Sequence, residues 1–260
     1  MTAPRPASRG LDNLVIMFDH LVDAIARYRA LGFTVIPGGS HASGTEVALV
    51  PFADGSYLQL VAFHTPSPTH RWWTAKEWGG GLIGLCLHTE TLAEDVAAVR
   101  AAGVPMGDPT PGGRVRPDGY RVAWSMATAP PPFMAEVPVL VEDHTPRDER
   151  VPRERVHENG VTGIAAITIA TEDVRRARVW WSALLAQHGM DMECPSLDAA
   201  GVRFDAGPHA IELLAPRRPA GPLAAWLDAR GPSPYAATLT GTRGARTFDE
   251  RRAGARLHIL

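Results

Sequence analysis

The chain has 260 residues, of which 45% are hydrophobic and 21% charged. A chain of this size and composition can bury a sizeable core, as one large domain or as two packed ones. The formal net charge is −2, and no basic stretch is interleaved with aromatic residues, so neither nucleic acid nor an anionic membrane is the expected partner. A small molecule is the expected partner, and a homodimer is kept open.

The two cysteines, Cys86 and Cys194, form neither a CxxC pair nor a secretory framework, which favours a reducing compartment. The N-terminal ten residues have no apolar signal-peptide core, and nowhere do about 18 uncharged apolar residues run together. We therefore expect a cytoplasmic protein.

One pattern recurs three times along the chain: a strand-like apolar run, an amphipathic helix, a glycine and a second short strand. The predicted first strands are 11–17, 82–87 and 164–169, and the predicted helix N-caps are Asp19, Thr91 and Thr171. The predicted second strands are 33–36, 104–106 and 190–194. Two more strands follow each time, at 46–52 and 56–63, at 120–126 and 137–142, and at 201–205 and 210–214. Each unit thus reads βαβββ, and residues 235–240 and 255–260 suggest a reduced fourth copy.

Two connecting stretches resemble linkers, 65–81 with its proline, tryptophan and glycine, and 143–160 with its charge and proline. The second is the predicted boundary: residues 1–142 form a first domain of two paired modules, and 161–260 a second half with one full and one reduced module. A βαβββ unit leaves one sheet face bare, so units must pair. The sequence predicts an α+β fold of tandem βαβββ modules whose curled mixed sheets form a cup, with a ligand in its interior.

Several segments carry a resemblance to a known family. They are Leu-Asp-Asn-Leu at 11–14, Ala-Leu-Gly-Phe-Thr-Val-Ile-Pro-Gly-Gly-Ser-His at 30–41, Gly-Thr at 44–45, Tyr-Leu-Gln-Leu at 57–60, Arg-Pro-Asp-Gly at 116–119, Trp124, the strand ending at Glu142, and His-Glu-Asn-Gly at 157–160. Together they resemble the glyoxalase-like family of the vicinal oxygen chelate superfamily. The resemblance spans nearly the whole chain, but one fold hosts many chemistries.

The resemblance implies a divalent metal ion, held in active members by one ligand on the first strand and one on the fourth strand of two paired modules. The matching positions are Asn13 and Gln59 in the first module, Gly84 and Glu142 in the second, and Ala166 and Glu212 in the third. None of the first-strand positions carries histidine, so the usual metal ligands are largely replaced.

A depleted ligand set inside this frame predicts a metal-independent protein, without a cofactor, that binds or transforms a small organic molecule in the cup of the first two modules. The predicted ligand-binding residues are Asn13, Thr45, Gln59, Arg116 and Trp124, and the predicted catalytic residues are His41 and Glu142. A buried, unpaired carboxylate at Glu142 would serve as a general base. Sequestration and turnover both stay open; an enzyme of this kind would be a lyase or isomerase.

Two alternatives remain. The first is a metal-dependent lyase, isomerase or dioxygenase whose divalent ion binds a shifted set of His41, Glu46, Gln59 and Glu142. The second is an interaction or structural role, with apolar side chains filling the cup. We expect the first half to carry most of the function, because the second half has one reduced module and Ala166 offers a ligand no polar atom.

Overall fold

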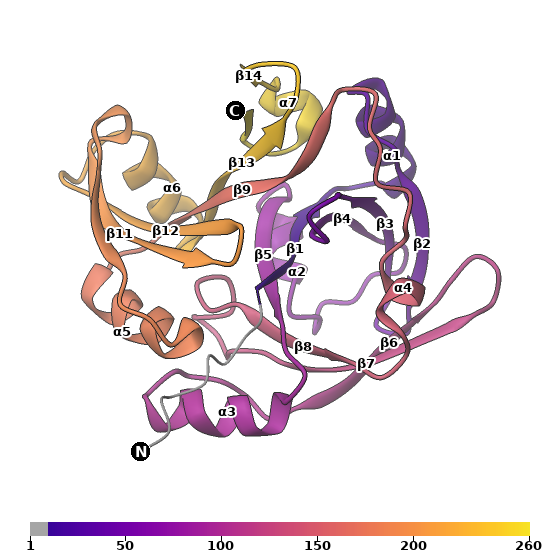
Figure 1. Ribbon diagram of the computed structural model, residues 1–260, viewed down its shortest axis with the longest axis horizontal. Helices are drawn as coiled ribbons and strands as arrows, with labels where there is room; N and C mark the ends of the chain where they lie inside the picture. The colour runs from indigo at the N-terminus through magenta and orange to yellow at the C-terminus, as the bar shows by residue number, and fades with distance from the viewer. Residues whose placement is uncertain (1–9) are drawn as a thin grey trace.

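The computed structural model describes residues 10–260, and the first part of this range folds as a barrel (Figure 1). Eight strands close the barrel in the order β1-β4-β3-β2-β6-β7-β8-β5. The strands are β1 (Leu11–Met17), β2 (Ile36–His41), β3 (Thr45–Pro51), β4 (Tyr57–Phe63), β5 (Gly81–His88), β6 (Thr110–Val115), β7 (Arg121–Ala127) and β8 (Val139–Asp143). The helices are α1 (Leu21–Ala30) after β1, α3 (Leu92–Ala101) after β5, and the short α2 (Trp73–Glu77) and α4 (Arg147–Arg150). Two βαβββ modules thus build one barrel.

Strand β1 shows how the sequence builds the barrel wall. All of its residues are buried, as its nearly continuous apolar sequence indicates. Ile16 belongs to the core outside the barrel, whereas Val15 and Met17 pack inside it. The pairing with β5 shifts register before Asn13, and such a bulge re-aims side chains. As a result the consecutive residues Asp12 and Asn13 both line the interior.

The second strand of each barrel module lies further along the chain than predicted. The strand expected at 33–36 shares only one residue with β2, and the one expected at 104–106 is not a strand. Phe33 and Val104 are instead buried in the core without belonging to the sheet. Their apolar character reflects packing against other side chains rather than strand pairing.

Strands β2 and β6 close the barrel by pairing with each other across the seam between the modules, Ser40 with Val115 and His41 with Arg114. A Cβ atom on Gly39 would lie 1.9 Å from the carbonyl oxygen of Val115, and this residue has a φ of +101°. Only glycine fits at position 39 of the seam. In the sequence alone, such a glycine is usually taken as a sign of a turn rather than of strand pairing.

Residues 161–260 form a second sheet with the strand order β10-β11-β12-β9-β13-β15-β14. Its elements are β9 (Val161–Ala170), α5 (Val174–Leu185), β10 (Met190–Cys194), a 3-10 turn (Pro195–Leu197), β11 (Ala199–Ala206), β12 (His209–Pro216), α6 (Pro222–Arg230), β13 (Ser233–Gly241), β14 (Arg246–Thr247), α7 (Glu250–Ala253) and β15 (Leu257–Ile259). The elements β9, α5, β10, β11 and β12 follow one another in the order βαβββ, and α6 is an element that the sequence pattern did not predict. The predicted α+β fold of tandem βαβββ modules with curled sheets is confirmed.

The predicted helix starts are only partly right. Thr91 directly precedes α3, but His20 rather than Asp19 precedes α1, and Asp173 rather than Thr171 caps α5. The hydroxyl of Thr171 instead accepts from the backbone N–H of Asp173 at 3.2 Å. It therefore fixes the turn that presents the true cap.

Helices α5 and α6 cover opposite faces of the second sheet. Trp181 of α5 shares a core with Leu213 of β12, while Leu227 of α6 packs with Leu214 of the same strand. Consecutive residues of a strand point to opposite faces, so α6 lies on the face that also carries Glu212. In the first half, the equivalent face of the sheet lines the interior of the barrel. In the second half, α6 covers part of this face.

One continuous core joins the two halves. Leu85 of β5 and Leu239 of β13 belong to the same apolar cluster, and these strands pack together (Figure 1). The segment 143–160 lies against the barrel: the backbone N–H of Thr34 donates to Nδ1 of His157 at 3.0 Å. This stretch therefore contributes to the first half as well as connecting it to the second.

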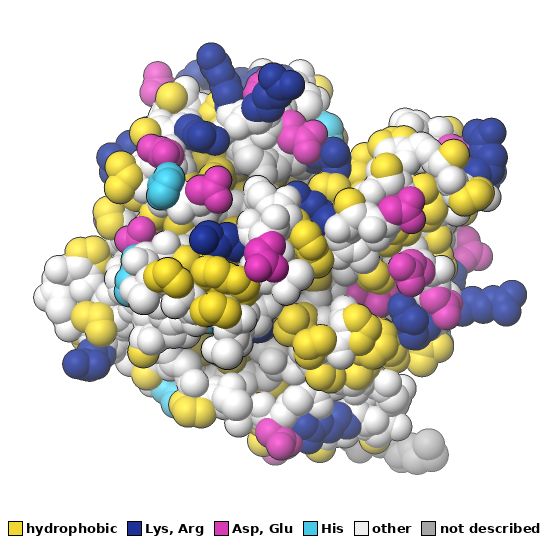
Figure 2. Space-filling view, turned by 180° about the vertical axis from the view of Figure 1, so that it is seen from behind, with side chains coloured by type: hydrophobic (Ala, Val, Ile, Leu, Met, Phe, Trp, Pro, Cys, Tyr) yellow, Lys and Arg dark blue, Asp and Glu magenta, His cyan; other side chains and the backbone are white. Residues whose placement is uncertain are grey.

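The surface is mixed in character. None of the helices within residues 10–260 has the length and apolar character needed to cross a membrane. Figure 2 shows basic and acidic side chains intermixed over one face of the molecule.

Candidate functional site in the barrel

The barrel encloses a cavity of about 100 Å³. Part of its wall is apolar or aromatic, formed by Val15, Tyr57, Trp72, Trp124, Met126, Val139 and Val141. The rest is polar, formed by Asp12, Asn13, His41, Ser43, Thr45, Gln59, His70, Arg71, Cys86, Arg114 and Arg150. A concave, largely apolar wall with a few converging polar groups is typical of a small-molecule site.

Two short helices fill the barrel on either side of this cavity. Ala75 of α2 packs with Met17 and Val61 at the carboxyl ends of β1 and β4. Arg150 of α4 enters at the other end, where it reaches Asp12 near the start of β1. The cavity therefore has an apolar floor and a charged opposite end.

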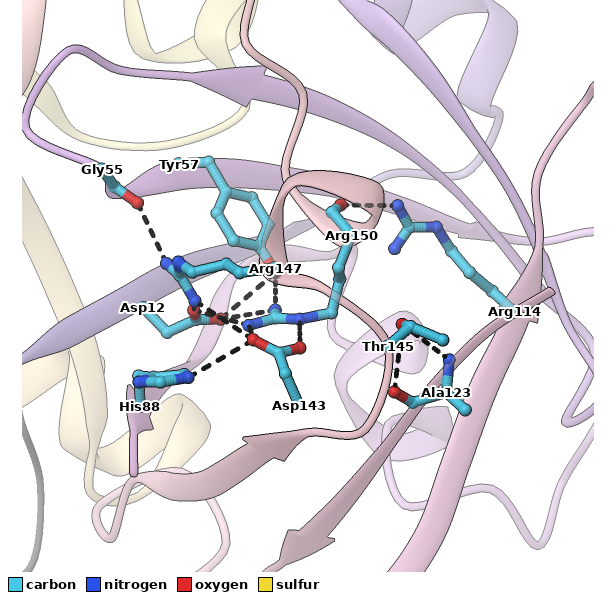
Figure 3. Close-up of polar contacts among 10 residues, drawn as sticks. All are labelled: Asp12, Gly55, Tyr57, His88, Arg114, Ala123, Asp143, Thr145, Arg147 and Arg150. Atoms are coloured by element: carbon cyan, nitrogen blue, oxygen red, sulfur yellow. Dashed lines mark hydrogen bonds and ion pairs between the residues drawn. The ribbon is translucent and has the colours of Figure 1, made fainter. Parts of the chain in front are cut away.

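The charged end is a buried ion network (Figure 3). The Nη1 and Nη2 atoms of Arg150 donate to the two carboxylate oxygens of Asp12 at 2.8 and 2.9 Å. Nη2 also donates to Asp143 at 3.0 Å, and Nη1 to the hydroxyl of Tyr57 at 2.8 Å. Arg147 pairs with Asp12 from the outer side. Two guanidinium groups thus balance two carboxylates.

The arginines keep both carboxylates ionised. Burial acts to raise the pKa of Asp12, but the charges and hydrogen bonds of Arg150 and Arg147 outweigh it, so the pKa lies well below its ordinary value. Burial also acts against ionisation of Asp143, but hydrogen bonds from His88 and Arg150 lower its pKa to about 2.

Five of the predicted site residues line this one cavity: Asn13, His41, Thr45, Gln59 and Trp124. Nδ1 of His41 lies 2.9 Å from the hydroxyl of Thr45, and its ring meets Trp124 edge-on with centroids 5.9 Å apart. The Nδ2 atom of Asn13 is buried and has no hydrogen-bond partner within residues 10–260. It is a donor that a bound molecule can satisfy.

Arg116 lies outside this cavity. Its Nη1 donates to Glu149 at 2.5 Å, and its other Nη atom pairs with Asp118. The guanidinium group is therefore occupied by surface carboxylates rather than turned toward the barrel interior.

Glu142 also lies outside the cavity lining. Trp124 of β7 faces the interior and pairs with Asp143 of β8, whereas Ser125 pairs with Glu142. Cross-strand partners share a face and neighbours alternate, so Asp143 turns inward and Glu142 outward. A shift of one residue separates the predicted carboxylate from the one that enters the barrel, and Asp143 is paired with arginine.

Sequence reasoning missed several ionisable residues of the interior: Asp12, His70, Arg71, Cys86, Arg114 and Arg150. One signal was present, since a charged residue inside an apolar strand, as Asp12 is, rarely lies buried without a partner. A second was the Pro-Gly-Gly sequence that occurs in both modules, at 37–39 and 111–113, directly before the two paired residues of the seam.

The side chains of the interior do not fit a metal ion. Within residues 10–260 no three His, Cys, Asp or Glu side chains come together in a way that could hold one. Asn13 and Gln59 offer neutral amides, and burial raises the pKa of Cys86 to about 12, so that its thiol stays protonated.

The shifted ligand set of the metal-dependent alternative is divided between two faces of the barrel. His41 and Gln59 line the cavity. Glu46 alternates with the inward-facing Thr45, so it points outward, as Glu142 does. These four side chains cannot share one ion in this arrangement.

A larger groove of about 780 Å³ runs along α1, the glycines at 79–81 and α7. Its charged side chains, such as Asp19, Asp23 and Glu250, are exposed to solvent. Exposed charged groups are solvated rather than left unpaired, so the groove offers a ligand fewer buried, unpartnered groups than the barrel cavity does. The barrel cavity is the better candidate site.

We expect the imidazole of His41 to stay neutral down to acidic pH. Burial, followed by the charges of Arg114 and His70, lowers its pKa to about 4. The pKa of a histidine in the unfolded chain is about 6.5, so the folded pKa is the lower of the two. The contribution of His41 to stability is therefore fully present above about pH 6.5 and is lost as the pH falls from there toward 4. NMR titration of the histidine rings, with His41→Gln to assign the signal, should give a midpoint near 4. Arg114→Met should raise it, and a wild-type midpoint at the ordinary value would contradict this prediction.

A closed barrel of paired βαβββ modules around an interior cavity defines the fold of the vicinal oxygen chelate superfamily. The family model of the glyoxalase-like domain matches residues 11–185, and the chain therefore belongs to this family. No match was found among curated proteins.

Solved structures with the same fold include a hypothetical protein from Staphylococcus aureus, at 11% identity and a TM-score of 0.72, over 96% of this chain and 98% of the other. A mutant of 4-hydroxymandelate synthase from Streptomyces coelicolor matches at 14% identity and a TM-score of 0.61, over 91% of this chain and 71% of the other. A xylose isomerase-like TIM barrel/4-hydroxyphenylpyruvate dioxygenase fusion protein matches at 15% identity and a TM-score of 0.58, over 99% of this chain and 50% of the other. At such identities the likeness concerns the fold alone.

Proposed function

We propose that this protein binds a small organic molecule in the barrel cavity without a metal ion. The observation that carries the proposal is the unpartnered, buried Nδ2 atom of Asn13 at the wall of that cavity. A buried donor without an acceptor costs about 1–3 kcal/mol, and a ligand oxygen would relieve that cost. Trp124 and Val141 supply the apolar surface for the rest of the molecule.

The metal-free part of the proposal rests on the chemistry of the available donors. The positions that match the family's metal ligands in the first module hold Asn13 and Gln59, which bind transition metals weakly. Glu142, at the matching position of the second module, points away from the cavity. The cavity is thus built to hydrogen-bond a ligand rather than to chelate through an ion.

If the ligand is turned over, His41 is the group that can accept a proton from it. Its ring is neutral near pH 7, whereas the interior carboxylates of Asp12 and Asp143 are paired with arginine. A neutral imidazole within reach of a bound molecule can act as a general base, and it is a weak one while its pKa lies near 4. The reaction would then be a proton transfer, as in a lyase or isomerase.

A fragment screen tests the proposal. The purified protein, before and after removal of metals by chelation, is screened by protein-observed NMR against small neutral and charged organic molecules, alongside elemental analysis. We expect bound fragments to shift the indole signal of Trp124 in both samples, with less than one metal ion per chain. A metal ion at one per chain that is needed for fragment binding would contradict the proposal.

A cavity-filling variant locates the binding site. Val141→Phe places a ring in the cavity and should abolish fragment binding, while circular dichroism checks that the fold is retained. Val156→Phe, at a residue that is 85% exposed, is the matched control. Equal binding by both variants would place the fragments elsewhere.

A further inference from the structure

Two guanidinium groups of the barrel cavity, those of Arg71 and Arg114, have no carboxylate partner within residues 10–260. Arg114 is only 6% exposed, and its Nε and Nη2 atoms donate to the backbone oxygens of Gly38 and Arg150, each at 2.7 Å. The Nη1 atom of Arg71 is buried and has no hydrogen-bond partner within residues 10–260. Both charges therefore face the cavity without compensation.

The other charges around the cavity are balanced. Arg147 and Arg150 face Asp12 and Asp143 in the ion network (Figure 3). On the face of the molecule that Figure 2 shows, acidic and basic groups are intermixed. An excess of positive charge is thus a property of the cavity, and burying an uncompensated charge is costly.

The position of Arg71 is fixed by its neighbours. The backbone N–H of Trp72 donates to Nδ1 of His70 at 3.1 Å, and that of Trp73 donates to the oxygen of His70 at 2.9 Å. The guanidinium carbon of Arg71 lies 4.8 Å from the centre of the Trp72 ring, a cation–π contact. The arginine is held in place by this turn and this ring, although no acceptor for its Nη1 hydrogens lies in the described part of the chain.

A second unpartnered donor lies in the same neighbourhood. Asn13 of β1 is paired across the sheet with Cys86 of β5, and the positive charge of Arg71 lowers the pKa of the Cys86 thiol against the larger effect of burial. Both Nδ2 of Asn13 and Nη1 of Arg71 are buried at the cavity wall without acceptors. A charged and a neutral donor together match the two oxygens of a carboxylate.

We infer that the ligand of the barrel cavity is a small organic carboxylate, whose oxygens accept hydrogen bonds from Nη1 of Arg71 and Nδ2 of Asn13. This inference rests on the proposed function and names its ligand class. The carbon chain lies against Val139, Val141 and Trp124. Since a cavity of roughly 150 Å³ holds a benzene molecule, the present one of about 100 Å³ admits a short chain of a few carbons.

Matched probes test the charge requirement. Butanoate, its neutral isostere butanamide and butylamine are titrated into the full chain, and binding is followed through the indole signal of Trp124. We expect butanoate to bind on the order of 10-fold or more tighter than butanamide, since a charged donor strengthens a hydrogen bond, and butylamine not to bind. If butanamide binds as tightly as butanoate, the ligand class is wrong while the proposed site stands. If none of the three, nor any other fragment, binds, the proposed function itself fails.

Variants at Arg71 assign the selectivity to this side chain. Arg71→Met should weaken butanoate binding by roughly 10- to 100-fold, as loss of a hydrogen bond to a charged group does, and leave butanamide binding within about threefold. Arg71→Lys should restore part of the preference for the anion. The matched control Arg153→Met, on a surface side chain that is 78% exposed, should change neither.

A stability measurement separates binding from a structural role. Because the empty protein buries the Arg71 charge without a partner, Arg71→Met should unfold at the same temperature as the wild type or higher. The inference would be overturned if Arg71→Met lowered the Tm by the same amount with and without the ligands and also lost butanoate and butanamide binding equally. Arg71 would then be a structural residue.

Discussion

Asp12→Ala should destabilise the protein by about 3–5 kcal/mol, the range found when one partner of a buried ion pair is removed. The variant leaves the guanidinium group of Arg150, whose residue is 3% exposed, without its bidentate acceptor. Urea unfolding followed by fluorescence gives the free energy. Asp118→Ala, which removes an exposed partner of Arg116, is the control and should cost less than about 1 kcal/mol.

The same network makes the free energy of unfolding depend on pH in the acidic range. The pKa of Asp143 is held at about 2 in the folded protein, against about 3.9 in an unfolded chain. A lowered folded pKa stabilises the fold fully above the unfolded value, and the stabilisation is lost as the pH falls from about 4 toward 2. Asp12→Ala should flatten this acid limb, because it removes a second carboxylate whose pKa Arg150 and Arg147 hold well below its ordinary value. An unchanged limb, or a loss no larger than that of Asp118→Ala, would contradict the role of the network.

Trp181→Ala should cost about 3–5 kcal/mol, as truncation of a fully buried aromatic side chain does. Trp181 is 0% exposed and lies on the buried face of α5. Leu184→Ala, one turn further along this face, should cost about 2–5 kcal/mol. Val179→Ala, at a residue of the same helix that is 57% exposed, should stay within about 0.5 kcal/mol of the wild type.

The shape of the unfolding curve adds a second result. Because residues from both halves belong to one apolar core, Trp181→Ala should shift a single transition, seen alike by the fluorescence of the remaining tryptophans and by circular dichroism. Two separate transitions, with only one of them shifted, would show that the halves unfold independently.

The elements that the sequence determined are those fixed by local periodicity. The first strand at 11–17 and the strand at 190–194 have the predicted bounds, and the helices after β1, β5 and β9 follow their apolar spacing. In these segments the side chains that must be buried recur at strand or helix spacing, so the pattern can be read without knowledge of the fold. The βαβββ order of the modules could be predicted from this periodicity, and with it the curled sheets of the fold.

Only the tertiary structure decided which polar side chains meet inside the barrel. Cavity residues on predicted strands, such as Asn13 and Gln59, could be named because strand alternation assigns a face, and Glu142 shows how an error of one residue reverses that face. Arg71 and Arg150 belong to segments that read as linkers, and Arg150 reaches Asp12 across 138 residues of sequence. Whether the charge of an arginine is paired depends on whether a carboxylate folds against it, and that is decided by distant parts of the chain coming together.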